Sequence, residues 1–79
     1  MSVAKITIET VEEAWNKYSE YKDRAEQHEF PLLIMIDLEL KPLYDHLKVE
    51  WNPRLGRSFL KAMAKVGEHY GFDIPEVDV

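Results

Sequence analysis

The sequence contains no cysteine, only three glycines and no long apolar run. Without cysteine the chain can form no disulfide and can use no thiolate as a nucleophile or metal ligand. The apolar run at residues 31–36 is far shorter than the roughly 20 residues that span a bilayer, and residues 1–5 have no apolar signal core. These absences predict a mature cytoplasmic protein, and 79 residues predict a single domain, 1–79.

Catalytic and metal-binding motifs are also missing. The three histidines, His28, His46 and His69, are not spaced as metal ligands on one helix. No serine lies in a Gly-x-Ser-x-Gly turn, and the glycines form no phosphate-binding loop. We therefore expect no cofactor, no metal site and no catalytic residue. A small enzyme that uses Asp37 or His46 as its acid or base is a further hypothesis, which requires a second polar group nearby.

Charge is present in quantity but unevenly distributed. The net charge is -5, which opposes unassisted binding to nucleic acid. Carboxylates dominate the first third of the chain and the tail, whereas four cationic residues lie between them at helical spacing: Arg54, Arg57, Lys61 and Lys65. These four residues would share about 80° of arc on one helix. They are either the solvated side of that helix or a surface that binds phosphate or acidic protein.

The first third predicts a strand followed by a helix. Ala4, Ile6 and Ile8 alternate with polar residues, as in a strand with one buried face. Thr10 and Glu13 have the spacing of a capping box, which predicts a helix over residues 11–28. The apolar positions of this helix would face the core, and they include Trp15, Tyr18 and Tyr21.

Residues 31–46 fit two structures. As a strand, Ile34, Ile36 and Leu38 would face the core. As a helix, seven apolar residues would fall within about 120° of arc: Leu32, Leu33, Ile36, Leu40, Leu43, Tyr44 and Leu47. Pro42 favours the strand, because proline inside a helix costs about 3 kcal/mol or more. Lys41 is also disfavoured in helical geometry because it precedes that proline.

The second half has clearer boundaries. Residues 47–51 alternate as a strand, and Asn52 followed by Pro53 is typical of a helix start. One apolar stripe then continues to Gly71, where a left-handed C-cap is expected. Pro75 limits any strand over residues 72–79 to a sheet edge.

This order predicts an α+β fold, a small ferredoxin-like βαββαβ sandwich with two helices on one face of an antiparallel sheet. The alternative is a three-helix domain with a short N-terminal strand. For function we predict a non-enzymatic, intracellular protein-binding module, such as a regulator, adaptor or inhibitor, with Arg54, Arg57, Lys61 and Lys65 as the partner-binding residues. The alternative is a protein that binds nucleic acid or mimics it, and homodimerisation is compatible with either function.

Overall fold

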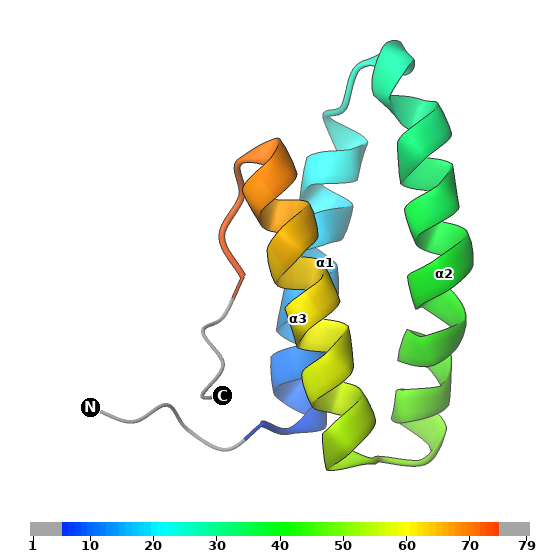
Figure 1. Cartoon of the computed structure of the whole chain (residues 1–79), viewed down its shortest axis with the longest axis vertical. Coiled ribbons are helices and arrows are strands. Elements are labelled where there is room, and N and C mark those ends of the chain that lie inside the picture. The colour runs from blue at the N-terminus through cyan, green and yellow to red at the C-terminus, as the bar shows by residue number, and fades with distance from the viewer. Residues whose placement is uncertain (1–5, 75–79) are drawn as a thin grey trace.

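The computed structural model describes residues 6–74, which form three α-helices joined by short connections (Figure 1). These are α1 (Ile8–Asp23), α2 (Phe30–Val49) and α3 (Pro53–Tyr70), and a short 3-10 helix, η1 (Gln27–Glu29), precedes α2. Consecutive helices run in opposite directions, and each contacts both of the others. No strand occurs within residues 6–74. The predicted ferredoxin-like α+β fold is therefore wrong, and the described residues fit the three-helix alternative.

The first helix begins earlier than predicted. The Thr7 hydroxyl accepts a hydrogen bond from the Thr10 amide at 3.4 Å, and the Thr10 hydroxyl accepts one from the Thr7 amide at 3.2 Å. This reciprocal pair replaces the capping box predicted at Thr10 and Glu13, so that Ile8 opens α1 instead of ending a strand. The predicted range of 11–28 is wrong at both ends. Residues 4 and 5 of the predicted strand lie outside the described residues.

The second helix is the main correction to the fold. Residues 30–49 are continuously helical through Pro42, and the helix buries Leu33, Leu40, Tyr44 and Leu47. Burial of one such side chain contributes about 1.5–3 kcal/mol, so the four together outweigh the roughly 3 kcal/mol cost of an internal proline. Proline has no amide hydrogen, so Pro42 leaves the backbone carbonyl of Leu38 without its helical partner. Both Leu38 and Pro42 are exposed, so water can reach this carbonyl.

The strand predicted over residues 47–51 is also wrong, because α2 continues into this segment. Leu47 and Val49 belong to the last turn of α2, and the chain leaves the helix at Glu50, whose φ of -138° and ψ of 102° are extended. Leu47 is buried, whereas Val49 is 88% exposed. The alternation of apolar and polar residues in this segment is therefore the end of a helical pattern. Trp51 follows in the turn before α3 and is half-buried.

The third helix confirms its predicted boundaries. The Asn52 side chain accepts hydrogen bonds from the amides of Arg54 at 2.9 Å and Leu55 at 3.2 Å, and Pro53 occupies the first turn. At the other end Gly71 has a φ of 90°, the left-handed geometry that glycine adopts without strain. Both boundary signals depend on local backbone geometry, which is why they could be read from the sequence.

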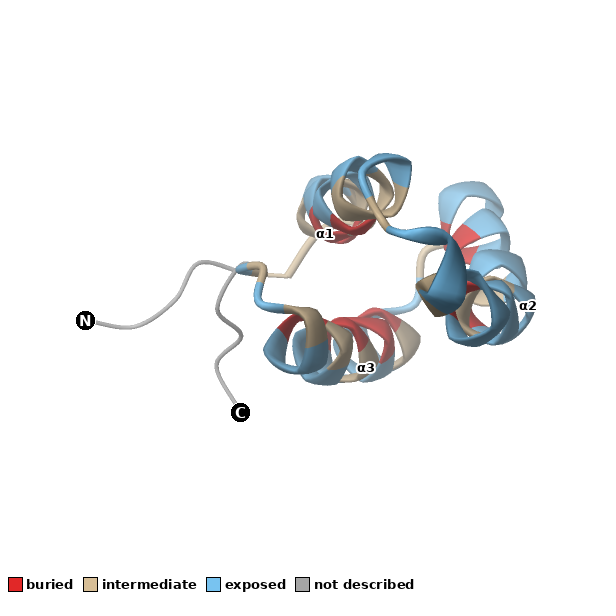
Figure 2. Cartoon of the chain, turned by 90° about the horizontal axis from the view of Figure 1, so that it is seen from above, coloured by how far each residue is buried: buried red, intermediate tan, exposed pale blue. Residues whose placement is uncertain are grey.

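Aromatic side chains from all three helices meet in the core. The ring centroids of Trp15 and Tyr44 are 5.0 Å apart, those of Tyr44 and Phe59 are 5.9 Å apart, and those of Trp15 and Phe59 are 6.2 Å apart. Tyr18 is fully buried, which agrees with the inward stripe predicted for the first helix, and Phe59 of α3 is fully buried as well. In Figure 2 the buried positions of the helices turn toward their common axis. This cluster fixes the rotation of each helix and so decides which residues face outward.

The described part of the predicted edge strand is irregular. After Gly71 the chain folds back on α3, and the Phe72 amide donates to the Gly67 carbonyl at 3.0 Å. A Cβ atom at position 67 would lie 2.5 Å from the Phe72 carbonyl oxygen, so glycine is required for this close approach. Residues 75–79, the rest of the predicted strand, lie outside the described residues.

Candidate functional site

The four predicted partner-binding residues lie together on the outward side of α3. Arg54, Arg57, Lys61 and Lys65 are all exposed, and we call this surface the basic face. None of them forms an ion pair with another residue between 6 and 74. Glu68 lies one turn further along the same helix and is also exposed. The basic face therefore carries positive charge that is available to a partner.

A hollow adjoins one end of the basic face. It has a volume of about 460 Å³ and is lined by Ile6, Thr7, Trp51, Pro53 and Arg57. The lining is mostly apolar, and its charged residue is Arg57. The prediction from sequence missed this hollow because it placed Trp51 in a strand. The Asn52-Pro53 signal after Trp51 was the available indication that this tryptophan lies in a turn beside a helix start.

The outward side of α1 has the opposite charge. Its exposed carboxylates share one side of the helix, and we call them the acidic face: Glu9, Glu13, Glu20 and Asp23. Because α1 and α3 both pack on the common core by their other sides, the acidic and basic faces belong to different outer surfaces of the domain (Figure 2). The carboxylates and the cationic residues, which are unevenly distributed along the sequence, thus form separate surfaces on α1 and α3.

The outward side of α2 is apolar, which the sequence-based prediction did not anticipate. Ile34, Met35 and Leu38 are 57%, 62% and 72% exposed, although Ile34 and Leu38 were expected to face the core of a sheet. We call these three residues, with the exposed Pro42, the apolar face. A signal was present, because residues 30–36, the first two turns of this helix, are all apolar and therefore cover every side of it. No helix in the described residues has the length and hydropathy needed to cross a membrane.

The candidate acid Asp37 is engaged in contacts between two helices. Its Oδ1 atom accepts a hydrogen bond from the Tyr18 hydroxyl at 2.7 Å, and its Oδ2 atom lies 2.8 Å from the Lys22 Nζ. The Tyr18 hydroxyl also lies 3.1 Å from the Leu33 carbonyl oxygen. Asp37 therefore links α2 to α1, which gives it a structural role in this fold. His46, the other candidate, is exposed on α2.

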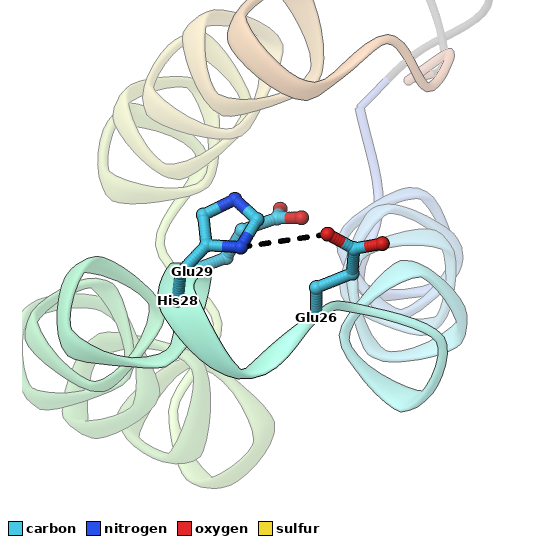
Figure 3. A group of neighbouring side chains, drawn as sticks. All are labelled: Glu26, His28 and Glu29. Atoms are coloured by element: carbon cyan, nitrogen blue, oxygen red, sulfur yellow. Dashed lines mark ion pairs between the residues drawn. The ribbon is translucent and has the colours of Figure 1, made fainter.

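The connection between α1 and α2 brings together a group of potential metal ligands. Figure 3 shows Glu26, His28 and Glu29, whose ligand atoms lie within 4.8 Å of one another. The His28 Nδ1 atom is 3.4 Å from a Glu26 carboxylate oxygen, and both side chains are about three-quarters exposed. Glu29 accepts a hydrogen bond from the Tyr21 hydroxyl. Two exposed side chains and one half-buried side chain on a short turn do not by themselves make a metal site, and the prediction from sequence named none here.

The tyrosines that hold these helices together have raised pKa values. Burial, followed by the hydrogen bond to Asp37, raises the pKa of Tyr18, and the hydrogen bond to Glu29, followed by burial, raises the pKa of Tyr21 to about 12. Burial also raises the pKa of Tyr44 and of Tyr70. In each case the folded protein favours the neutral phenol.

We expect these tyrosines to make the fold sensitive to alkali. In the unfolded chain tyrosine ionises near pH 10, so between pH 10 and about 12 the folded protein binds more protons than the unfolded chain. The stability that these raised pKa values contribute is therefore complete below pH 10, and it is lost as the pH rises through this range. Circular dichroism and tyrosinate absorbance should change together there, and both should recover at neutral pH. Ionisation of all four tyrosines near pH 10 with no change in helix content would contradict this expectation.

Comparisons with family models, curated proteins and solved structures found no match to this chain. Its function has to be inferred from the three outward faces and the hollow beside Arg57.

Proposed function

We propose that this protein is a non-enzymatic protein-binding module whose basic face docks on an acidic surface of another protein. The observation that carries this proposal is the alignment of Arg54, Arg57, Lys61 and Lys65 on one exposed side of α3, with no ion-pair partner among residues 6–74. Charged surfaces of this kind steer association and select the partner by complementarity of charge.

The hollow beside Arg57 supports a protein partner over a simple anion. Strong interfaces combine a buried apolar or aromatic anchor with surrounding charges. Trp51 offers an aromatic wall for an inserted side chain, and Arg57 lies where it can pair with a carboxylate next to that side chain. The preferred partner is therefore a segment that carries an apolar anchor followed by acidic residues.

The distribution of charge makes nucleic acid a weaker candidate. The chain has a net charge of -5, and the acidic face of α1 would repel a long phosphate backbone that extends beyond α3. An acidic protein segment is short enough to avoid that repulsion. Binding of duplex or single-stranded DNA at low salt, with affinity that falls steeply as salt rises, would favour the nucleic-acid alternative.

Charge reversal on α3 tests the proposal. Proteins that co-purify with the wild-type chain from its native host should be lost from the variant Arg57→Glu/Lys61→Glu, or their affinity should fall at least about tenfold. The matched control is Lys17→Glu/Arg24→Glu, which makes the same change in net charge at exposed positions outside α3. The control should retain the wild-type partners.

Two results would contradict the proposal. One is an unchanged set of partners for Arg57→Glu/Lys61→Glu, which would place the interface elsewhere. The other is equal loss of partners from both variants, which would make net charge the determinant instead of the basic face. Circular dichroism of each variant verifies that the helices are intact.

A further inference from the structure

Every strongly exposed large hydrophobic side chain in the described residues belongs to α2. These side chains are Phe30, Leu32, Ile34, Met35, Leu38 and Val49, with exposed fractions from 41% to 88%. Apolar residues scattered singly over a surface are ordinary, but a cluster confined to one helix is typical of an interaction surface. In Figure 2 the side of α2 turned away from α1 and α3 is exposed along its length.

The spacing of these residues suits packing against another helix. Met35, Leu38, Pro42, Asp45 and Val49 follow one another at alternating intervals of three and four residues, which keeps them on one line along the helix surface. Asp45 is the polar member, and it accepts contacts from Lys41 at 3.4 Å. This line runs through the apolar face and continues to Val49, and it has the repeat of a helix that meets another helix side by side.

The balance of charge around the apolar face favours a second copy of this chain as the occupant. In a symmetric dimer the same face of both copies meets, so a face with net charge would repel itself. The acidic face and the basic face each carry charge of one sign. Around the apolar face the charges of Glu39 and Asp45 balance those of Lys41 and Lys48. Among the three outward faces only that of α2 can meet its own copy without repulsion.

We propose that the protein forms a twofold-symmetric dimer through the apolar face of α2. This inference does not depend on the proposed function of the basic face, which stays accessible on α3 in such a dimer. It also explains why a chain with a net charge of -5 keeps its largest exposed hydrophobic side chains on its least charged helix.

The available area indicates a weak dimer. A fully exposed aliphatic side chain offers on the order of 100 Å² of apolar surface, so Ile34, Met35, Leu38 and Val49 together offer about 280 Å² per copy. Two copies with their polar rims bury about 1,000 Å², an area typical of weak or transient interfaces. The backbone carbonyl left open at Pro42 also needs water or a donor when the face is covered. We therefore expect a dissociation constant in the micromolar range.

Sedimentation equilibrium over a range of protein concentrations tests the dimer. The variant Leu38→Glu puts a carboxylate on the twofold interface and should weaken dimerisation at least about 100-fold. The control Asn16→Glu makes the same change in net charge at an exposed position of α1 and should dimerise like the wild type. Because Leu38 is 72% exposed, Leu38→Glu should keep its helix content.

Salt distinguishes this dimer from other assemblies. Contact between neutral apolar faces should persist at high salt, where screened charge pairs weaken. Open polymers that dissolve in salt would indicate pairing of the acidic face with the basic face and would overturn the proposal. A wild-type chain that stays monomeric at hundreds of micromolar, or a Leu38→Glu variant that dimerises normally, would overturn it as well. Loss of a different bound protein from Leu38→Glu with a monomeric wild type would assign the face to that protein.

Discussion

Replacement of Phe59 by alanine is expected to destabilise the protein by about 3–5 kcal/mol, the usual cost of removing a buried phenyl ring. Phe59 is fully buried, and its ring lies within 6.2 Å of Trp15 and 5.9 Å of Tyr44, measured between ring centroids. It is thus the point at which α3 meets both other helices. A domain of this size has a net stability of roughly 4–12 kcal/mol, so Phe59→Ala removes a large part of it.

Urea unfolding followed by circular dichroism measures this loss of free energy. Ser58→Ala is a suitable control, because Ser58 is the neighbouring residue on the exposed side of α3 and should change stability by less than about 0.5 kcal/mol. A loss below about 1 kcal/mol for Phe59→Ala would show that the aromatic cluster does not hold the helices together.

The opposite effect is expected at Pro42. Its replacement by alanine restores an amide that can donate to the Leu38 carbonyl and removes the clash of the proline ring with the preceding turn, a gain of about 3 kcal/mol. The unfolded chain also becomes more flexible, which lowers the free energy of unfolding by about 0.4–1 kcal/mol. The net result is a stabilisation of about 2 kcal/mol, or an increase in Tm of roughly 10 °C.

Thermal unfolding of Pro42→Ala, compared with Glu39→Ala on an exposed position of the same helix, tests this expectation. Glu39→Ala should leave the Tm nearly unchanged. Pro42→Ala with a Tm equal to or below that of the wild type would contradict a continuous helix through this position, because in an extended segment the alanine amide would have no helical acceptor to bind.

Local signals in the sequence were sufficient for the third helix. Asn52, Pro53 and Gly71 act through backbone geometry within a few residues, and all three have their predicted roles in the structure. At the start of α1 the sequence offers competing threonine caps at Thr7 and Thr10, and the choice between them depends on how the helix packs. The prediction selected the later cap and consequently assigned Ile6 and Ile8 to a strand.

The second helix could not be predicted from local preferences alone. Pro42 opposes a helix, and the alternating residues 47–51 resemble a strand. The burial of Leu33, Leu40, Tyr44 and Leu47 against two other helices decides the outcome, and this energy appears only when the whole domain is assembled. The apolar face was missed for the same reason, whereas the basic face was found because its four residues lie on one helix that was assigned correctly.

The three outward faces require residues 30–49 to be a single helix, and backbone NMR chemical shifts over this segment measure that most directly. We expect helical shifts on both sides of Pro42, with short-range contacts between residues three and four positions apart. Extended shifts over residues 32–40 together with cross-strand contacts to residues 47–51 would restore the sheet and remove the apolar face.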